Sequence, residues 1–217
     1  MIPAILLAVH IAAGSAALVT AAVALSTAKG RVHHVRAGRV YAAAMAVVCA
    51  TALPLAVLGS DVVLLLVAVF SFYLVLAGWR FARNASGRAR FVDWAAVALM
   101  GLTGLGMWVY AVALCLRGDA QWVTMAVFGF IALALAAIDA RYHRSPRRSG
   151  RQRIARHLTN MLAGTIATVT AVVVVNVDTS PVWLAWILPT ILITPLIVWW
   201  NRRVKRGAGG LRGLVRE

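Results

Sequence analysis

The chain has 217 residues, of which 62% are hydrophobic and only 13% are charged. A soluble globular domain is about 45–50% apolar, so this composition excludes an ordinary soluble protein and indicates a membrane protein. The 22 Lys and Arg residues against 6 Asp and Glu would suggest nucleic-acid binding in a soluble protein, but here they lie between apolar runs, so we predict no nucleic-acid partner.

Seven apolar runs of roughly the length that crosses a bilayer follow one another along the chain. We expect them at residues 2–25, 40–59, 62–79, 94–116, 121–138, 158–177 and 182–200. The predicted fold class is therefore all-α, an integral membrane bundle of about seven transmembrane helices. We predict one domain over residues 1–200, followed by a basic tail over residues 201–217. The first run is too long for the core of a cleavable signal peptide, so it is expected to remain as a span.

The segments between the runs differ in charge on the two sides of the membrane. Short turns follow the second, fourth and sixth runs, whereas longer basic segments lie at 26–39, 80–93, 139–157 and 201–217. All 22 Lys and Arg residues except Arg117 fall in these longer segments. Cytoplasmic loops are the ones rich in Lys and Arg, so we predict an external amino terminus and a cytoplasmic carboxyl terminus. Membrane lipids with anionic headgroups are then the expected partners of the basic segments.

Six stretches of the chain occur in this order: HIAAGSAALVTAAVAL, KGRVHHVRAGRVY, FSFYLVLAGWR, DW, RHLTNMLAGTIATVTAVVVVN and LPTILITPLIVWW. With them, the chain resembles a bacterial family of multi-span membrane proteins that is known only as a domain of unknown function. The resemblance covers nearly the whole chain and leaves open whether His33 or His34 matches the family's His-Arg-Gly pattern. It implies a multi-span protein of the bacterial cytoplasmic membrane, and it implies no particular activity.

Polar side chains inside the runs are the first candidates for function, because an ionisable group is costly in a membrane. His10 lies well inside the first run, about 12 Å from its outer end at about 1.5 Å per residue. Four hydroxyl residues fall at a similar level on other runs: Thr51, Ser71, Tyr110 and Thr170. One hypothesis is a polar cavity that binds a ligand near His10. The other is a closed structural layer, because hydroxyl groups often bond to backbone carbonyls or across helix contacts in membranes.

The sixth run carries a polar stripe of its own. His157, Met161, Thr165 and Thr168 recur at helical spacing, so they share one face of the predicted helix. Such a stripe fits a path across the bilayer, and it also fits close helix packing. Thr168 therefore joins the ligand-binding candidates.

Charged residues gather at the predicted cytoplasmic helix ends: Arg39, Arg80, Asp93, Asp139, Arg156 and His157. In the structural interpretation, Arg and Asp form ion pairs at the membrane surface, each partly in water and contributing about 1 kcal/mol or less. The alternative is a metal or haem site with these candidate ligands: His34, His157, Asp93 and Asp139. Zinc needs three or four such ligands, whereas a b-type haem needs the two histidines alone.

Two functional hypotheses follow from these residues. The first is a transporter, channel or receptor for a small molecule or ion, with a polar cavity near His10. The second is a membrane-bound enzyme that depends on a metal or haem at His34 and His157. No nucleotide-binding, protease or redox motif is present to identify a cofactor or a reaction. We favour the first, because polarity inside a membrane needs more explanation than charge at its surface.

Overall fold

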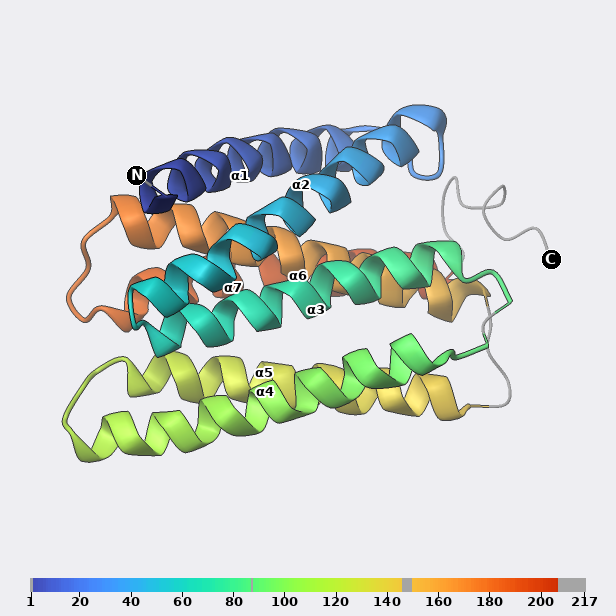
Figure 1. The fold of residues 1–217 in the computed structure, drawn as a ribbon. Coiled ribbons are helices and arrows are strands. Elements are labelled where there is room, and N and C mark those ends of the chain that lie inside the picture. Colours follow the sequence, from blue (N-terminus) through green and yellow to red (C-terminus); the bar gives the residue numbers. More distant parts are fainter. Residues whose placement is uncertain (1, 87, 146–149, 207–217) are drawn as a thin grey trace.

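The computed structural model describes residues 2–86, 88–145 and 150–206, and these residues form helices and short connections without a strand. The helices are α1 (Ile2–Ser26), α2 (Val32–Leu58), α3 (Val62–Arg83), α4 (Phe91–Leu116), α5 (Trp122–Arg144), α6 (Gly150–Asn176) and α7 (Trp183–Arg206) (Figure 1). Within the described ranges, all seven are long and apolar enough to cross a membrane. The predicted all-α fold with seven spans is confirmed.

The helices extend beyond the apolar runs into the basic segments. α2 begins at Val32 rather than at residue 40, and α6 begins at Gly150 rather than at residue 158. α3 and α5 likewise continue to Arg83 and Arg144. Arginine is a good helix former, and its long side chain carries the charge out to water, so a helix does not end where its apolar run ends.

The predicted boundary between the domain and the tail falls inside a helix. α7 continues through residues 201–206 and ends at Arg206. The rest of the predicted tail, residues 207–217, lies outside the described residues.

Lys29 holds the connection between α1 and α2. Its ammonium group donates hydrogen bonds to the carbonyl oxygens of Ala24 (3.1 Å), Leu25 (2.6 Å) and Thr27 (3.2 Å). The first two carbonyls belong to the last turn of α1, where a helix leaves its acceptors unpaired, and Thr27 directly follows the helix. The same ammonium lies 5.0 Å from the ring centroid of Trp200 on α7. Partial burial lowers the pKa of Lys29 below its ordinary value. Lys29 therefore caps α1 and also ties it to α7.

The turn between α2 and α3 is short and well defined. The amide of Gly59 donates to the carbonyl of Leu55 (2.9 Å), which closes the last turn of α2. Ser60 follows with a φ of 52°, in the left-handed region that reverses the chain. The Asp61 carboxylate then accepts from the amide of Leu64 (2.9 Å) and caps α3. Such a turn makes α2 and α3 antiparallel neighbours.

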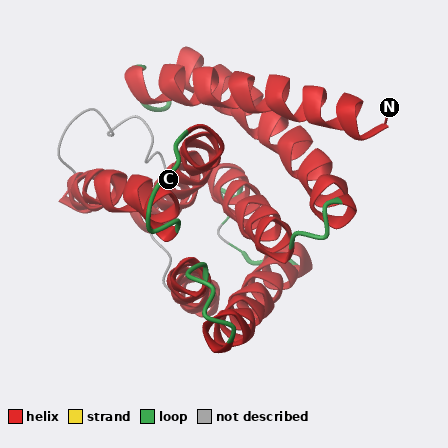
Figure 2. Ribbon diagram, turned by 90° about the vertical axis from the view of Figure 1, so that its left-hand side faces the viewer, coloured by secondary structure: helices red, strands yellow, loops and turns green. Residues whose placement is uncertain are grey.

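The bundle is built from antiparallel neighbours in the chain. α1 packs on α2, α4 on α5 and α6 on α7, while α3 packs against α2, α4 and α6. α1 lies obliquely across one edge of the bundle (Figure 2). The main apolar core lies among α3, α4 and α5 and reaches Trp186 and Ile187 of α7. α3 therefore occupies a central position, with the α4–α5 hairpin on one side and α6 on another.

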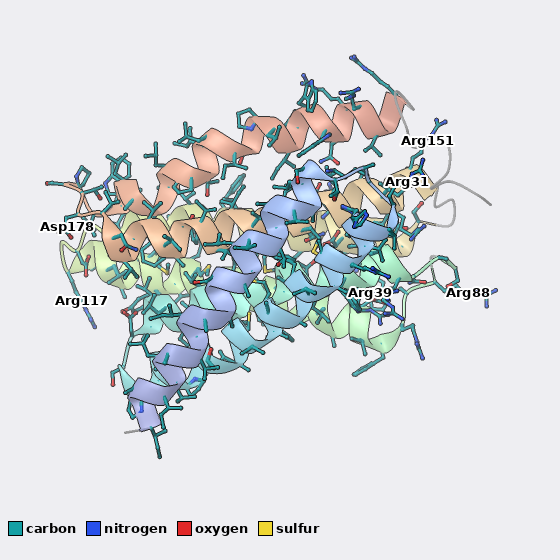
Figure 3. All side chains as sticks on the ribbon, turned by 90° about the horizontal axis from the view of Figure 1, so that it is seen from above. Arg31, Arg39, Arg88, Arg117, Arg151 and Asp178 are labelled. Atoms are coloured by element: carbon teal, nitrogen blue, oxygen red, sulfur yellow. The ribbon has the colours of Figure 1, made fainter. Side chains whose placement is uncertain are left out.

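The charged loops lie at opposite ends of the bundle. Arg31, Arg39, Arg88 and Arg151 lie at one end, whereas Arg117 and Asp178 lie at the other (Figure 3). The end that carries the many arginines is the predicted cytoplasmic side, and an odd number of spans places the two termini on opposite sides.

A reporter fused after Glu217 should read cytoplasmic, and one inserted at Gly118 should read external. The reason is the concentration of basic residues at the opposite end from Gly118. Paired fusions of alkaline phosphatase and a fluorescent protein provide the measurement, since each is active on one side only. Both sites reading the same side would contradict the seven-span topology.

Candidate functional site

His10 contacts one hydroxyl group on the neighbouring helix. Its Nδ1 lies 2.9 Å from Thr51 Oγ1 and 3.2 Å from the carbonyl oxygen of Val48. The Thr51 hydroxyl itself donates to the carbonyl oxygens of α2, at 2.8 Å to Val47. His10 is half-buried, and α1 packs chiefly on α2, so the imidazole lies at an edge of the bundle. The structure thus brings His10 and Thr51 together as the sequence suggested.

The other members of the predicted layer lie elsewhere in the bundle. Tyr110 packs against the apolar core of α3, α4 and α5, and Ser71 is buried on α3. The Thr168 hydroxyl donates to the carbonyl of Gly164 (2.9 Å) on its own helix. Thr170 is buried on α6, and its hydroxyl has no hydrogen-bond partner in the described structure. Neither His10 nor any of these four residues lines the small cavity beside Asp139 or the groove between α2 and α3.

Asp139, by contrast, lies at the centre of a buried polar cluster. The residue is fully buried (0% exposed) and lies near the C-terminal end of α5. One carboxylate oxygen accepts from Arg156 Nε at 2.5 Å, and the other accepts from the Tyr73 hydroxyl at 2.5 Å. Asn160 Nδ2 lies 3.4 Å from that second oxygen. The predicted ion pair is confirmed, but the prediction that it is partly in water is wrong for Asp139.

Asp93 forms a second ion pair at the start of α4. Arg80 on α3 donates to both carboxylate oxygens, from Nε to one and from Nη2 to the other at 2.8 Å. The backbone amide of Arg90 adds a third donor at 2.7 Å. This arrangement caps α4 and fixes its first turn to the end of α3. The predicted pairing of Asp93 with an arginine of a neighbouring helix end is confirmed.

A small cavity lies between these two ion pairs. Its volume is about 10 Å³, roughly the room needed by one water molecule. Tyr73, Arg80, Asp93, Asp139 and His143 all line it. Three helices thus supply two carboxylates, a guanidinium, a phenol and an imidazole to one space.

His143 is held against this space by aromatic packing. Its ring stacks on Phe81 with centroids 5.5 Å apart and an interplanar angle of 8°. Tyr142 and Trp94 pack around it at centroid distances of 5.5 and 5.8 Å. The imidazole therefore has a fixed position between α3, α4 and α5.

Two atoms of the Asp139 cluster retain unused hydrogen-bonding capacity. Arg156 Nη2 and Asn160 Oδ1 are buried and have no partner within the described residues. Buried polar atoms are nearly always paired, and an unpaired one inside a protein costs about 1–3 kcal/mol. An unpaired guanidinium donor and an unpaired amide acceptor are each suited to a water molecule or a small polar solute. The cluster thus contains more buried hydrogen-bonding groups than its own hydrogen bonds satisfy.

The four predicted metal ligands do not form one set. Within the described residues, no group of three or more His, Cys, Asp or Glu lies close enough to hold a metal ion. Asp93 and Asp139 are each bound by an arginine. Nδ1 of His34 lies 3.0 Å from the carbonyl oxygen of Ala24, and Nδ1 of His157 lies 2.9 Å from that of Gly78. Both imidazoles therefore serve as donors to backbone near α1 and α3.

No family model, no curated protein and no solved structure matches this chain. Membership of the bacterial family that the chain resembles therefore stays a prediction. The helices establish an integral membrane protein with multiple spans.

Sequence reasoning missed three residues of this site: Tyr73, Asn160 and His143. Each shares a helix face with a charged residue that was identified. Tyr73 precedes Arg80 by seven positions, His143 follows Asp139 by four, and Asn160 follows Arg156 by four. Spacings of four and seven place side chains on one face of a helix. A search for polar residues one or two helical turns from each charged residue would have found all three.

Proposed function

We propose that the protein is a transporter that couples the movement of a small solute or ion to proton binding at Asp139. The observation that carries this proposal is the fully buried Asp139 carboxylate, which joins α5 to α3 and α6 beside a water-sized polar cavity. Ionisable residues in this position are characteristic of substrate and proton pathways in membrane proteins. The proposal keeps the transport hypothesis and moves its centre from His10 to Asp139.

Stability alone gives a poor account of the cluster. A buried ion pair often contributes no more to stability than apolar residues of the same volume, because desolvation of both charges offsets their attraction. Tyr73 and Asn160 add two further polar groups to this buried site. Open hydrogen-bonding capacity on Arg156 and Asn160 adds to the cost. These costs are expected where a proton or solute has to bind.

Protonation of Asp139 changes the contacts between helices. The ionised Asp139 carboxylate on α5 binds Arg156 on α6. α5 and α6 are not close packing partners, so this ion pair is a main link between the two helices. A proton on Asp139 removes its charge and weakens the link, while Arg156 keeps its positive charge. Arg156 is then able to bind a solute anion or water, and the α4–α5 hairpin is freer to shift against α6. Proton binding and solute movement are coupled through this one contact.

The proposal is tested in liposomes that contain the purified protein and a pH-sensitive dye. Pools of small carboxylic acids, amino acids, sugars and inorganic ions are added in turn. We expect one pool to drive proton entry, because solute and proton use the same cluster. Replacing Asp139 with Asn should reduce the dye signal to that of protein-free liposomes, because an amide side chain does not bind the proton that a carboxylate binds.

Asp178→Asn is the matched control, because Asp178 is exposed at the opposite end of the bundle. Tyr73→Phe keeps the carboxylate and removes one donor, so proton-coupled transport should persist in this variant. Transport that proceeds equally well in Asp139→Asn, or the absence of proton movement with every pool, would sink the proposal.

A further inference from the structure

An open groove lies between α2 and α3 on the side away from the polar cluster. Its volume is about 280 Å³. Ala43 and Ala46 of α2 and Phe72 and Leu76 of α3 line it, with Arg39 and Trp79 at one end. α2 and α3 meet at their shared turn and separate toward their other ends (Figure 1). The groove is therefore apolar along its length and carries a charged residue where it opens toward the predicted cytoplasmic side.

Two arginines stand at this end of the groove. Arg39 is exposed, and its side chain makes no hydrogen bond or ion pair with any described residue. The Arg83 guanidinium lies 5.1 Å from the ring centroid of Trp79, which itself lines the groove. Neither α2 nor α3 contains an Asp or Glu. The end of the groove thus has positive charge with no carboxylate on either helix to neutralise it.

We propose that this groove binds an acidic phospholipid, with one acyl chain along α2 and α3 and the phosphate at Arg39 and Arg83. From Arg39 to Cys49 the groove follows α2 for about 15 Å, at about 1.5 Å per residue, which is half of a typical hydrocarbon core. Alanines on α2 leave room for a chain. Trp79 stands where tryptophans gather, at the level of the lipid headgroups.

A phospholipid fits this groove better than a second copy of the protein does. In a symmetric dimer each copy would present the same surface, so Arg39 and Arg83 of both copies would approach one another without a carboxylate from α2 or α3. A lipid phosphate supplies the missing negative charge, and an acyl chain fills the narrow apolar part. The proposal concerns the lipid-facing side of α2 and α3 and is independent of transport at Asp139.

Native mass spectrometry of the purified protein in detergent tests the proposal, with phosphatidylglycerol and phosphatidylcholine of the same acyl chains. We expect phosphatidylglycerol to bind more tightly. Arg39→Gln combined with Arg83→Gln should weaken phosphatidylglycerol binding about fivefold for each arginine removed, because each basic residue near a membrane surface contributes about that much. Ala46→Trp fills the groove and should abolish binding of both lipids there.

The controls change the same residue types outside the groove. Arg88→Gln removes a charge at the same end of the bundle, and Ala98→Trp adds a ring to the exposed side of α4. Both should bind phosphatidylglycerol as the wild-type protein does. Equal binding of the two lipids by the wild type, or unchanged affinity after loss of both groove arginines, would overturn the proposal. A dimer that Ala46→Trp converts to monomer would also overturn it, since the second copy would then be the occupant.

Discussion

Replacing Asp139 with Ala should lower the free energy of unfolding by about 3–5 kcal/mol, the cost of leaving one member of a buried ion pair alone. Arg156 loses the carboxylate that its Nε donates to, and the Tyr73 hydroxyl loses its acceptor. The Arg156 side chain is 12% exposed, so water compensates for little of this loss. Reversible unfolding in mixed detergent micelles, followed by circular dichroism, measures the change.

Two further variants show how much of this cost comes from the burial of an unpaired charge. Asp139→Ala combined with Arg156→Leu removes both charges, so it should regain most of the stability that the single change loses. Asp93→Ala breaks a pair whose arginine is 22% exposed, so its cost should be smaller, about 1.5 kcal/mol. Equal costs for Asp139→Ala and Asp93→Ala would show that burial of Asp139 does not strengthen its ion pair.

The seven helices follow from the sequence because hydrophobic length is a strong signal for a membrane span. The pairing of Asp93 and Asp139 with arginines also follows, because the topology brings one end of every helix to the same side. The helix starts at Val32 and Gly150 do not follow from hydropathy. Apolarity defines which residues lie in lipid, whereas helix ends depend on local hydrogen bonds that hydropathy does not record.

The location of the polar site could not be predicted from depth alone. Depth along each helix placed His10 level with several hydroxyls, but it carried no information on the direction of each side chain. His10 lies on α1, which packs chiefly on α2 at the edge of the bundle. Asp139 lies on a helix beside the central α3, and it is there that buried charges meet. Which helices neighbour one another decides the site, and a single sequence does not show this.

The polar cluster lies where the α4–α5 hairpin meets α3 and α6. α4 and α5 pack tightly on each other and carry Asp93 and Asp139, while α3 and α6 carry Arg80 and Arg156. Each ion pair therefore crosses from the hairpin to the rest of the molecule. A rigid hairpin is needed if protonation of one carboxylate is to shift the whole unit rather than a single side chain. The contact between α4 and α5 is thus the second place where a large effect is expected.

Replacing Gly129 with Ala should lower the free energy of unfolding by about 1–3 kcal/mol, the usual cost of adding a methyl group to a closely packed site. A Cβ on Gly129 would lie 2.5 Å from Trp108 Cδ1 and 3.0 Å from the carbonyl oxygen of Gly104. The Trp108 side chain can turn toward lipid, but the backbone of Gly104 moves only if α4 and α5 separate. Gly104→Ala should act in the same way, because its Cβ would lie 3.1 Å from the carbonyl oxygen of Gly129.

Gly101→Ala is the matched control on α4, because nothing lies within 4 Å of a Cβ added there. It should leave stability unchanged or raise it slightly, since Ala forms helices better than Gly. Gly104→Ala with Gly129→Ala should cost less than the two single changes added together, because one separation of α4 and α5 relieves both contacts. Strict additivity, or a Gly101→Ala cost equal to the others, would mean that close backbone approach does not hold this hairpin together. If the hairpin does act as one unit, the double variant should also weaken the effect of pH on transport, because Asp139 would then move without carrying α4.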